Sequence, residues 1–132
     1  MNEEKLLKYF IEAKDIGKIE NPTTVGIGGD PGCSDYIKLY LKIEDEIIKD
    51  AKAEVYGCHV AIAATSAFLQ LIKNKHYRDA INIKPDDVLK ELGGLPEEKI
   101  HCTTLGPLAL ENAIQDYILD MLCQQAEENL DD

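Results

Sequence analysis

Apolar and polar residues alternate most regularly in the middle of the chain. Residues 37–43 alternate with a period of two, which is typical of a half-buried strand. An acidic turn at residues 44–46 separates this segment from residues 47–56, which alternate again. Two alternating segments joined by a short turn predict an antiparallel hairpin. Residues 23–27 add a shorter strand after the Asn21-Pro22 break.

Helical spacing, with apolar residues every three or four positions, flanks this strand region on both sides. It predicts helices at residues 2–13, 59–73, 76–82 and 84–92, and a last helix that starts between Thr104 and Pro107. The apolar face of the last helix is predicted from Leu110, Ile114, Tyr117, Ile118, Met121 and Leu122. The expected fold class is α+β, a small three-stranded antiparallel sheet with helices packed on one face.

The length of 132 residues suits a single domain, residues 1–132. Within it we expect an N-terminal helical segment at residues 1–20, a loop at residues 95–99 and an acidic tail at residues 126–132 that frays.

The charge balance narrows the possible partners. The formal net charge is −11, so phosphate backbones and anionic membrane surfaces would repel the chain. No run of about 18 apolar residues is present, and the first five residues lack the apolar core of a signal peptide. We therefore expect no nucleic-acid or membrane partner, and a cytoplasmic protein with reduced thiols.

Four cysteines carry the candidate chemistry. Cys33 lies in a Gly- and Pro-rich loop, Cys58 at a strand-to-helix junction, and Cys102 in the loop that opens the last helix. These three are predicted to lie at the ends of elements, where side chains can converge. Cys123 falls inside the last helix beside Leu122, so we interpret it as a packing residue.

The helix N-termini expected near Cys58 and Cys102 favour thiolate, the form that binds metals. Asp35 and His101 lie close in sequence to these cysteines and could add an oxygen or a nitrogen ligand. The spacing contains no Cys-x-x-Cys pair, so by itself it leaves open a shared metal or cluster site and a set of scattered free cysteines.

The residues around three of the cysteines match a known pattern. The chain resembles the NifU/IscU-type iron–sulfur cluster assembly scaffolds from about Asn21 to Tyr117. The matching segments, in chain order, are Asn21-Pro22-Thr23-Thr24-Val25-Gly26, Gly32-Cys33-Ser34-Asp35, Tyr56-Gly57-Cys58-His59-Val60-Ala61-Ile62-Ala63, Lys99-Ile100-His101-Cys102 and Ala113-Ile114-Gln115-Asp116-Tyr117.

The resemblance implies a scaffold rather than an enzyme, on which a [2Fe–2S] cluster is assembled and then transferred. It implies that Cys33, Cys58 and Cys102 hold the cluster, with Asp35 or His101 as the fourth ligand. The implied partners are a cysteine desulfurase, an iron or electron donor and acceptor apo-proteins. Whether the working form is a monomer or a homodimer, and whether two subunits merge their clusters into [4Fe–4S], stays open.

One departure from the pattern concerns a chaperone. Family members served by a dedicated Hsp70-type chaperone carry Leu-Pro-Pro-Val-Lys before the third cysteine, and residues 95–99 here read Leu-Pro-Glu-Glu-Lys. Burying two glutamates in an apolar peptide groove is costly, so we expect weak or absent binding of such a chaperone.

Three alternatives belong to other classes. The same three cysteines with Asp35 could hold zinc, including in the cluster-free form, and one of them could accept persulfide sulfur as in a sulfurtransferase. A hydrolase could use Cys102 activated by a histidine. The neighbouring His101 is weak evidence for such a pair, because the side chains of residues adjacent in sequence rarely point at each other. A purely structural domain would have no reason to place cysteines at loop ends.

Overall fold

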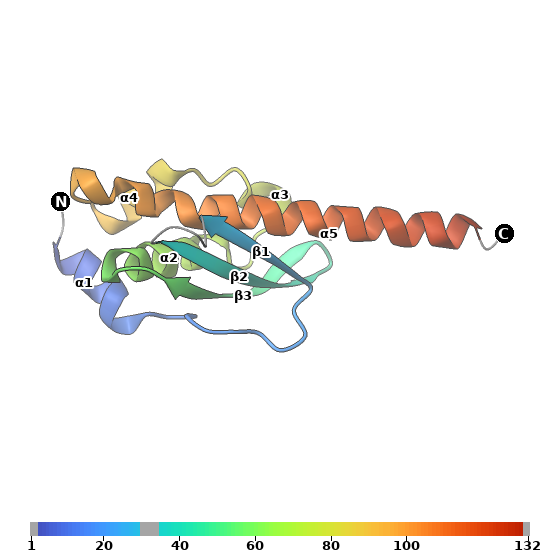
Figure 1. Cartoon of the computed structure of the whole chain (residues 1–132), viewed down its shortest axis with the longest axis horizontal. Coiled ribbons are helices and arrows are strands. Elements are labelled where there is room, and N and C mark those ends of the chain that lie inside the picture. The colour runs from blue at the N-terminus through green and yellow to red at the C-terminus, as the bar shows by residue number, and fades with distance from the viewer. Residues whose placement is uncertain (1–2, 30–34, 131–132) are drawn as a thin grey trace.

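The computed structural model describes residues 3–29 and 35–130, with the side chains of the last helix as far as Gln125. One helix precedes three strands, and the remaining helices follow them (Figure 1). The elements are α1 Glu3–Glu12, β1 Thr24–Gly29, β2 Tyr36–Glu44, β3 Ile47–Tyr56, α2 His59–Ile72, α3 Tyr77–Ala80, α4 Pro85–Leu92, the 3-10 helix η1 Glu97–Thr104 and α5 Leu105–Leu130.

The three strands form one antiparallel sheet in the order β1-β2-β3. Ile37, Leu39 and Leu41 of β2 are fully buried, as the alternation predicts. The register pairs Tyr36 with Tyr56, so the start of β2 lies beside the end of β3. This pairing determines which side chains meet at that end of the sheet.

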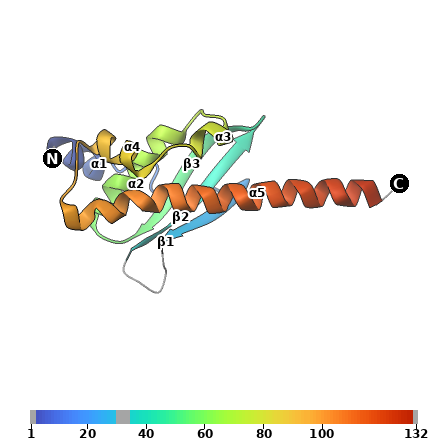
Figure 2. The same cartoon turned by 90° about the horizontal axis from the view of Figure 1, so that it is seen from above.

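Helices cover one face of the sheet, α5 over β1 and β2, and α2 over β3 (Figure 2). Nearly every residue of α2 is apolar or small, and ten of its residues are buried. In turn α1 and α4 pack against α2. The predicted α+β class, with a three-stranded antiparallel sheet and helices on one face, is confirmed.

The backbone of α5 approaches β1 very closely. Gly26 and Gly28 face the helix, and a Cβ atom at either position would overlap a carbonyl oxygen of α5, that of Ala109 or of Leu105. The hydroxyl of Thr24 donates a hydrogen bond of 2.8 Å to the carbonyl of Ala113. Glycine is therefore required on β1 by the distance between strand and helix.

The N-terminal segment is bonded to α4, to the edge of β3 and to the end of α2. Tyr9 of α1 donates a hydrogen bond of 2.5 Å to Glu91 of α4. After α1 the chain runs along the outer edge of β3, where Ala53 donates to the carbonyl of Asp15 (3.0 Å) and accepts from the N–H of Gly17 (2.8 Å). The Asp15 carboxylate forms an ion pair with Lys73 of α2.

Three details differ from the sequence predictions. Residues 97–104 form a 3-10 helix where a loop was expected. The last helix continues to Leu130, so residues 126–130 are helical where fraying was expected. Its far half extends beyond the sheet (Figure 1), and Leu122, assigned to the apolar face, is exposed. None of the helices in the described ranges is both long enough and apolar enough to cross a membrane.

The close approach of α5 gives a stability prediction. Gly26→Ala or Gly28→Ala should lower the free energy of unfolding by about 3 kcal/mol, because backbone atoms of α5 must move to admit the new methyl group. Urea unfolding followed by circular dichroism measures this change. The matched control is Ile27→Ala, whose partly exposed side chain lies between the two glycines and should cost at most about 1 kcal/mol. Equal losses in all three variants would contradict the close-packing argument.

Candidate metal or cluster site

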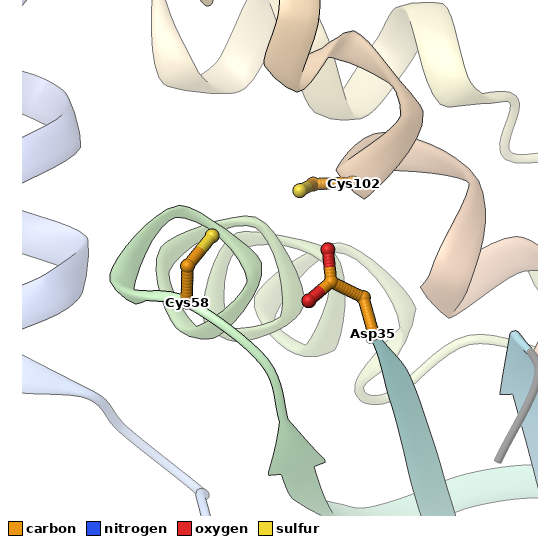
Figure 3. A group of neighbouring side chains, drawn as sticks. All are labelled: Asp35, Cys58 and Cys102. Carbon is orange, nitrogen blue, oxygen red and sulfur yellow. The ribbon is translucent and has the colours of Figure 1, made fainter. Parts of the chain in front are cut away.

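Three side chains from three different elements converge at one end of the sheet. Asp35 directly precedes β2, Cys58 lies between β3 and α2, and Cys102 belongs to η1. Their ligand atoms all lie within 4.8 Å of one another, and the side chains point toward a common space (Figure 3). Cys33 lies outside the described residues.

The sheet register explains how Asp35 and Cys58 meet. Because Tyr36 pairs with Tyr56, the residue before β2 lies next to the residues that follow β3. Gly57 leaves room for the carboxylate, since a Cβ atom at this position would lie 2.6 Å from Oδ1 of Asp35. The strand pairing therefore sets the separation between the carboxylate and the thiol.

The 3-10 helix adds the other side of the site. Residues three apart are eclipsed in a 3-10 helix, so Lys99 and Cys102 project from the same side of η1. Lys99 Nζ lies 3.7 Å from the sulfur of Cys58. No role of this lysine is predicted from the sequence, because its three-residue spacing from Cys102 is informative only once residues 97–104 are known to form a 3-10 helix.

His101 lies at the margin of the site. Its Nε2 atom is 3.1 Å from Oδ2 of Asp35 and 3.7 Å from the sulfur of Cys102. The side chain of His101 is more than half exposed, whereas that of Asp35 is largely covered. His59, the first residue of α2, is exposed and packs edge-on against Phe10 instead.

The pKa values of the two described site thiols are shifted in opposite directions. Burial acts to raise the pKa of Cys58, but hydrogen bonds from the backbone of Ala61 and Val60 and the charge of Lys99 outweigh it, so that the pKa is lowered. Cys58 is the N-cap residue of α2, so its sulfur lies beside the backbone N–H groups of the first turn. The expectation of a thiolate-favouring helix end therefore holds for Cys58.

For Cys102 that expectation is wrong. The residue is 1% exposed and belongs to the hydrophobic core. Burial, with the charges of Cys58 and Asp35, raises the pKa of Cys102 to about 12. Without a bound cation this thiol keeps its proton at neutral pH, and a metal would have to displace that proton to bind the sulfur.

The interpretation of Cys123 as a packing residue is also wrong. Cys123 is exposed, because the half of α5 that carries it extends past the sheet (Figure 2). It does not join the group formed by Asp35, Cys58 and Cys102.

Two soft thiol ligands and a hard carboxylate that converge from three segments define a class of small α+β proteins suited to binding iron, zinc or an iron–sulfur cluster. The sequence identifies the family. The chain belongs to the NifU-like N-terminal domain family, whose model matches residues 1–124. The resemblance stated from the motifs is thereby confirmed.

Individual relatives agree with this assignment. The chain is 38% identical to the iron–sulfur cluster assembly scaffold protein IscU of Aquifex aeolicus, over 88% of this chain and 75% of the relative. It is 39% identical to IscU 1 of Archaeoglobus fulgidus, another iron–sulfur cluster assembly scaffold protein, over 89% of this chain and 76% of the relative.

Solved structures share the fold. A SUF-system protein from Fervidobacterium islandicum AW-1 superposes with a TM-score of 0.67 at 24% identity, over 83% of this chain and 93% of that one. The N-terminal part of a NifU-like protein from Brucella abortus superposes with a TM-score of 0.56 at 22% identity, over 87% of this chain and 90% of that one.

The contrast between the two thiols is testable by alkylation. In the metal-free protein at neutral pH, iodoacetamide should modify Cys58 much faster than Cys102, because only the thiolate reacts and Cys102 is both protonated and buried. Lys99→Ala should slow the reaction of Cys58 by removing a cation that lowers its pKa, and Lys90→Ala on α4 is the control. Peptide mapping by mass spectrometry gives each rate. Faster reaction of Cys102 than of Cys58 would contradict the assignment.

Proposed function

We propose that this chain is a scaffold, not an enzyme, on which a [2Fe–2S] cluster is assembled from iron and sulfide and then passed to apo-proteins. The observation that carries the proposal is the convergence of Asp35, Cys58 and Cys102 within 4.8 Å. In this proposal Cys33 supplies a third thiolate from the segment that precedes Asp35. Thiolates are the usual protein ligands of iron–sulfur clusters.

The mixed ligand set supports a transient cargo rather than a permanent cofactor. An electron-transfer protein commonly surrounds its cluster with four cysteines. Here a carboxylate, a hard ligand that suits the iron of a sulfur cluster less well than thiolate does, lies beside the two described sulfurs. A cluster held in this way can be released to an acceptor protein.

For the fourth ligand we propose Asp35 rather than His101. The carboxylate of Asp35 lies within 4.8 Å of both described sulfurs. His101 contacts that carboxylate through Nε2, so it is placed to orient Asp35 and to exchange with it when the cluster forms or leaves.

The proposed partners follow from this chemistry. Sulfur would come from a cysteine desulfurase, an iron or electron donor would act with it, and the cluster would go to acceptor apo-proteins. Because the site needs reduced thiols, we propose the cytoplasm as the working compartment. Zinc suits the same donors and is the proposed occupant of the cluster-free site, without a sulfur-acceptor role of its own.

Anaerobic reconstitution tests the proposed function. The purified chain is incubated either with ferric iron and sulfide, or with ferrous iron, a cysteine desulfurase, cysteine and dithiothreitol as the reductant of the persulfide sulfur. The product is examined by absorption and Mössbauer spectroscopy. A [2Fe–2S] spectrum and transfer to an apo-ferredoxin are expected. A protein that binds zinc tightly but forms no cluster under these conditions would contradict the proposal.

The ligand set predicts which thiols matter. Cys33→Ser, Cys58→Ser and Cys102→Ser should each reduce cluster retention by about tenfold or more, because the hydroxyl of serine is a poorer iron ligand than thiolate. Cys123→Ser, at an exposed position on α5, should retain the cluster and is the matched control. Iron and sulfide content after desalting measures retention. Cluster loss in a well-folded Cys123→Ser variant would overturn the assignment.

Asp35→Ala tests whether the carboxylate promotes release. We expect slower transfer of the cluster to an apo-ferredoxin and a cluster-loaded protein that is more stable in air. The variant lacks the hard carboxylate ligand and the polar surface through which an acceptor approaches the cluster. The matched variant His101→Ala removes the partner of Asp35 but leaves the carboxylate in place. If Asp35 only terminates a turn, Asp35→Ala will transfer at the wild-type rate and melt at a lower temperature.

A further inference from the structure

An apolar groove runs along α5 on the side that faces the loop between α3 and α4. It encloses about 620 Å³. Its apolar lining residues include Ile81, Ile83, Pro85, Leu108, Ile114 and Ile118. The volume lies in the range of binding clefts, and the shape is that of an open trough between a helix and a loop.

Large apolar side chains are exposed in and beyond this groove. Ile81 and Leu108 are each 43% exposed and Ile118 is 37% exposed. The apolar surface continues onto the extended half of α5 through Leu119 and Leu122, which are 57% and 56% exposed. Leu122 follows Ile118 by four residues and therefore lies on the same side of α5. Exposed apolar side chains grouped along one groove are typical of interaction sites.

The charges around the groove have mainly one sign. Along its 26 residues α5 contains five acidic residues and no lysine or arginine. Of these acids Glu111 lines the groove. On α4, Asp86 and Asp87 directly follow the lining residue Pro85. Lys84 lines the opposite wall. An occupant that carries positive charge is therefore favoured, and a second copy of this acidic helix is disfavoured.

We propose that this groove binds an amphipathic helix of a partner protein, with apolar anchors at i, i+3 or i+4 and i+7 flanked by lysine or arginine. Such a helix presents its apolar side chains to the trough, as in other helix-in-groove interfaces. Thr104 lines one end of the groove and follows Cys102 by two residues. The partner would thus dock beside the candidate site and leave Cys58 and Asp35 accessible.

The experiment uses a fluorescently labelled peptide of about 18 residues, made of leucine and lysine in an amphipathic helical order. One comparison peptide has the same composition in scrambled order, and another has glutamate in place of lysine. Anisotropy titrations against the full metal-free chain need no cluster, so their result is independent of the proposed function. The groove variants are Ile118→Gln and Glu111→Lys, and the matched controls on α1 are Ile11→Gln and Glu12→Lys.

The wild type should bind the amphipathic lysine peptide at least about tenfold more tightly than either comparison peptide. Each groove variant should weaken binding about fivefold or more, and the α1 controls should leave it unchanged. Ile11 is more exposed than Ile118, so its substitution controls for the loss of exposed apolar surface in general.

Equal binding of the scrambled peptide, or equal losses in the controls, would overturn the proposal, because binding would then reflect only the net charge of the chain. Sedimentation velocity tests whether a second copy of the chain occupies the groove instead. A wild-type dimer that Ile118→Gln converts to a monomer would show that a second copy fills the groove, and would also overturn the proposal.

Discussion

The contact between the backbones of β1 and α5 is the constraint on which the rest of the structure depends. Gly26 and Gly28 let the helix approach the strand more closely than any side chain permits. The hydrogen bonds from Thr24 to the Ala113 carbonyl and from Asn112 to the Ile27 carbonyl fix the helix along the strand direction. Because α5 continues directly from η1, its position on the sheet also places Cys102 opposite the ends of β2 and β3.

Much of the fold could be predicted from the sequence because the relevant signals are local. The alternation of β2 and the apolar run of α2 each reflect burial against a single neighbouring layer. The extended half of α5 could not be predicted in this way. Its apolar residues have the spacing of a buried face, but the sheet ends before it reaches Leu122, and the size of the sheet is not a local property of the helix.

The candidate site was predictable in its residue types but not in its electrostatics. The motifs place a carboxylate and two thiols at the ends of elements, and Asp35, Cys58 and Cys102 do meet there. The difference between the two thiols depends on which of them the core encloses. Cys102 was expected in a loop, and it is enclosed because residues 97–104 wind into a 3-10 helix against α2 and α5. The same winding brings Lys99 to Cys58.

The strip of chain along the outer edge of β3 has a consequence for solubility. An edge strand with free backbone groups is a template for pairing with other molecules, which leads to aggregation. Here Asp15 and Gly17 occupy both backbone hydrogen-bonding groups of Ala53, and Lys73 and Gln70 hold Asp15 in place. The connection between α1 and the sheet thus covers the edge of β3 at Ala53, and loss of the Asp15 carboxylate would weaken its hold on this part of the edge.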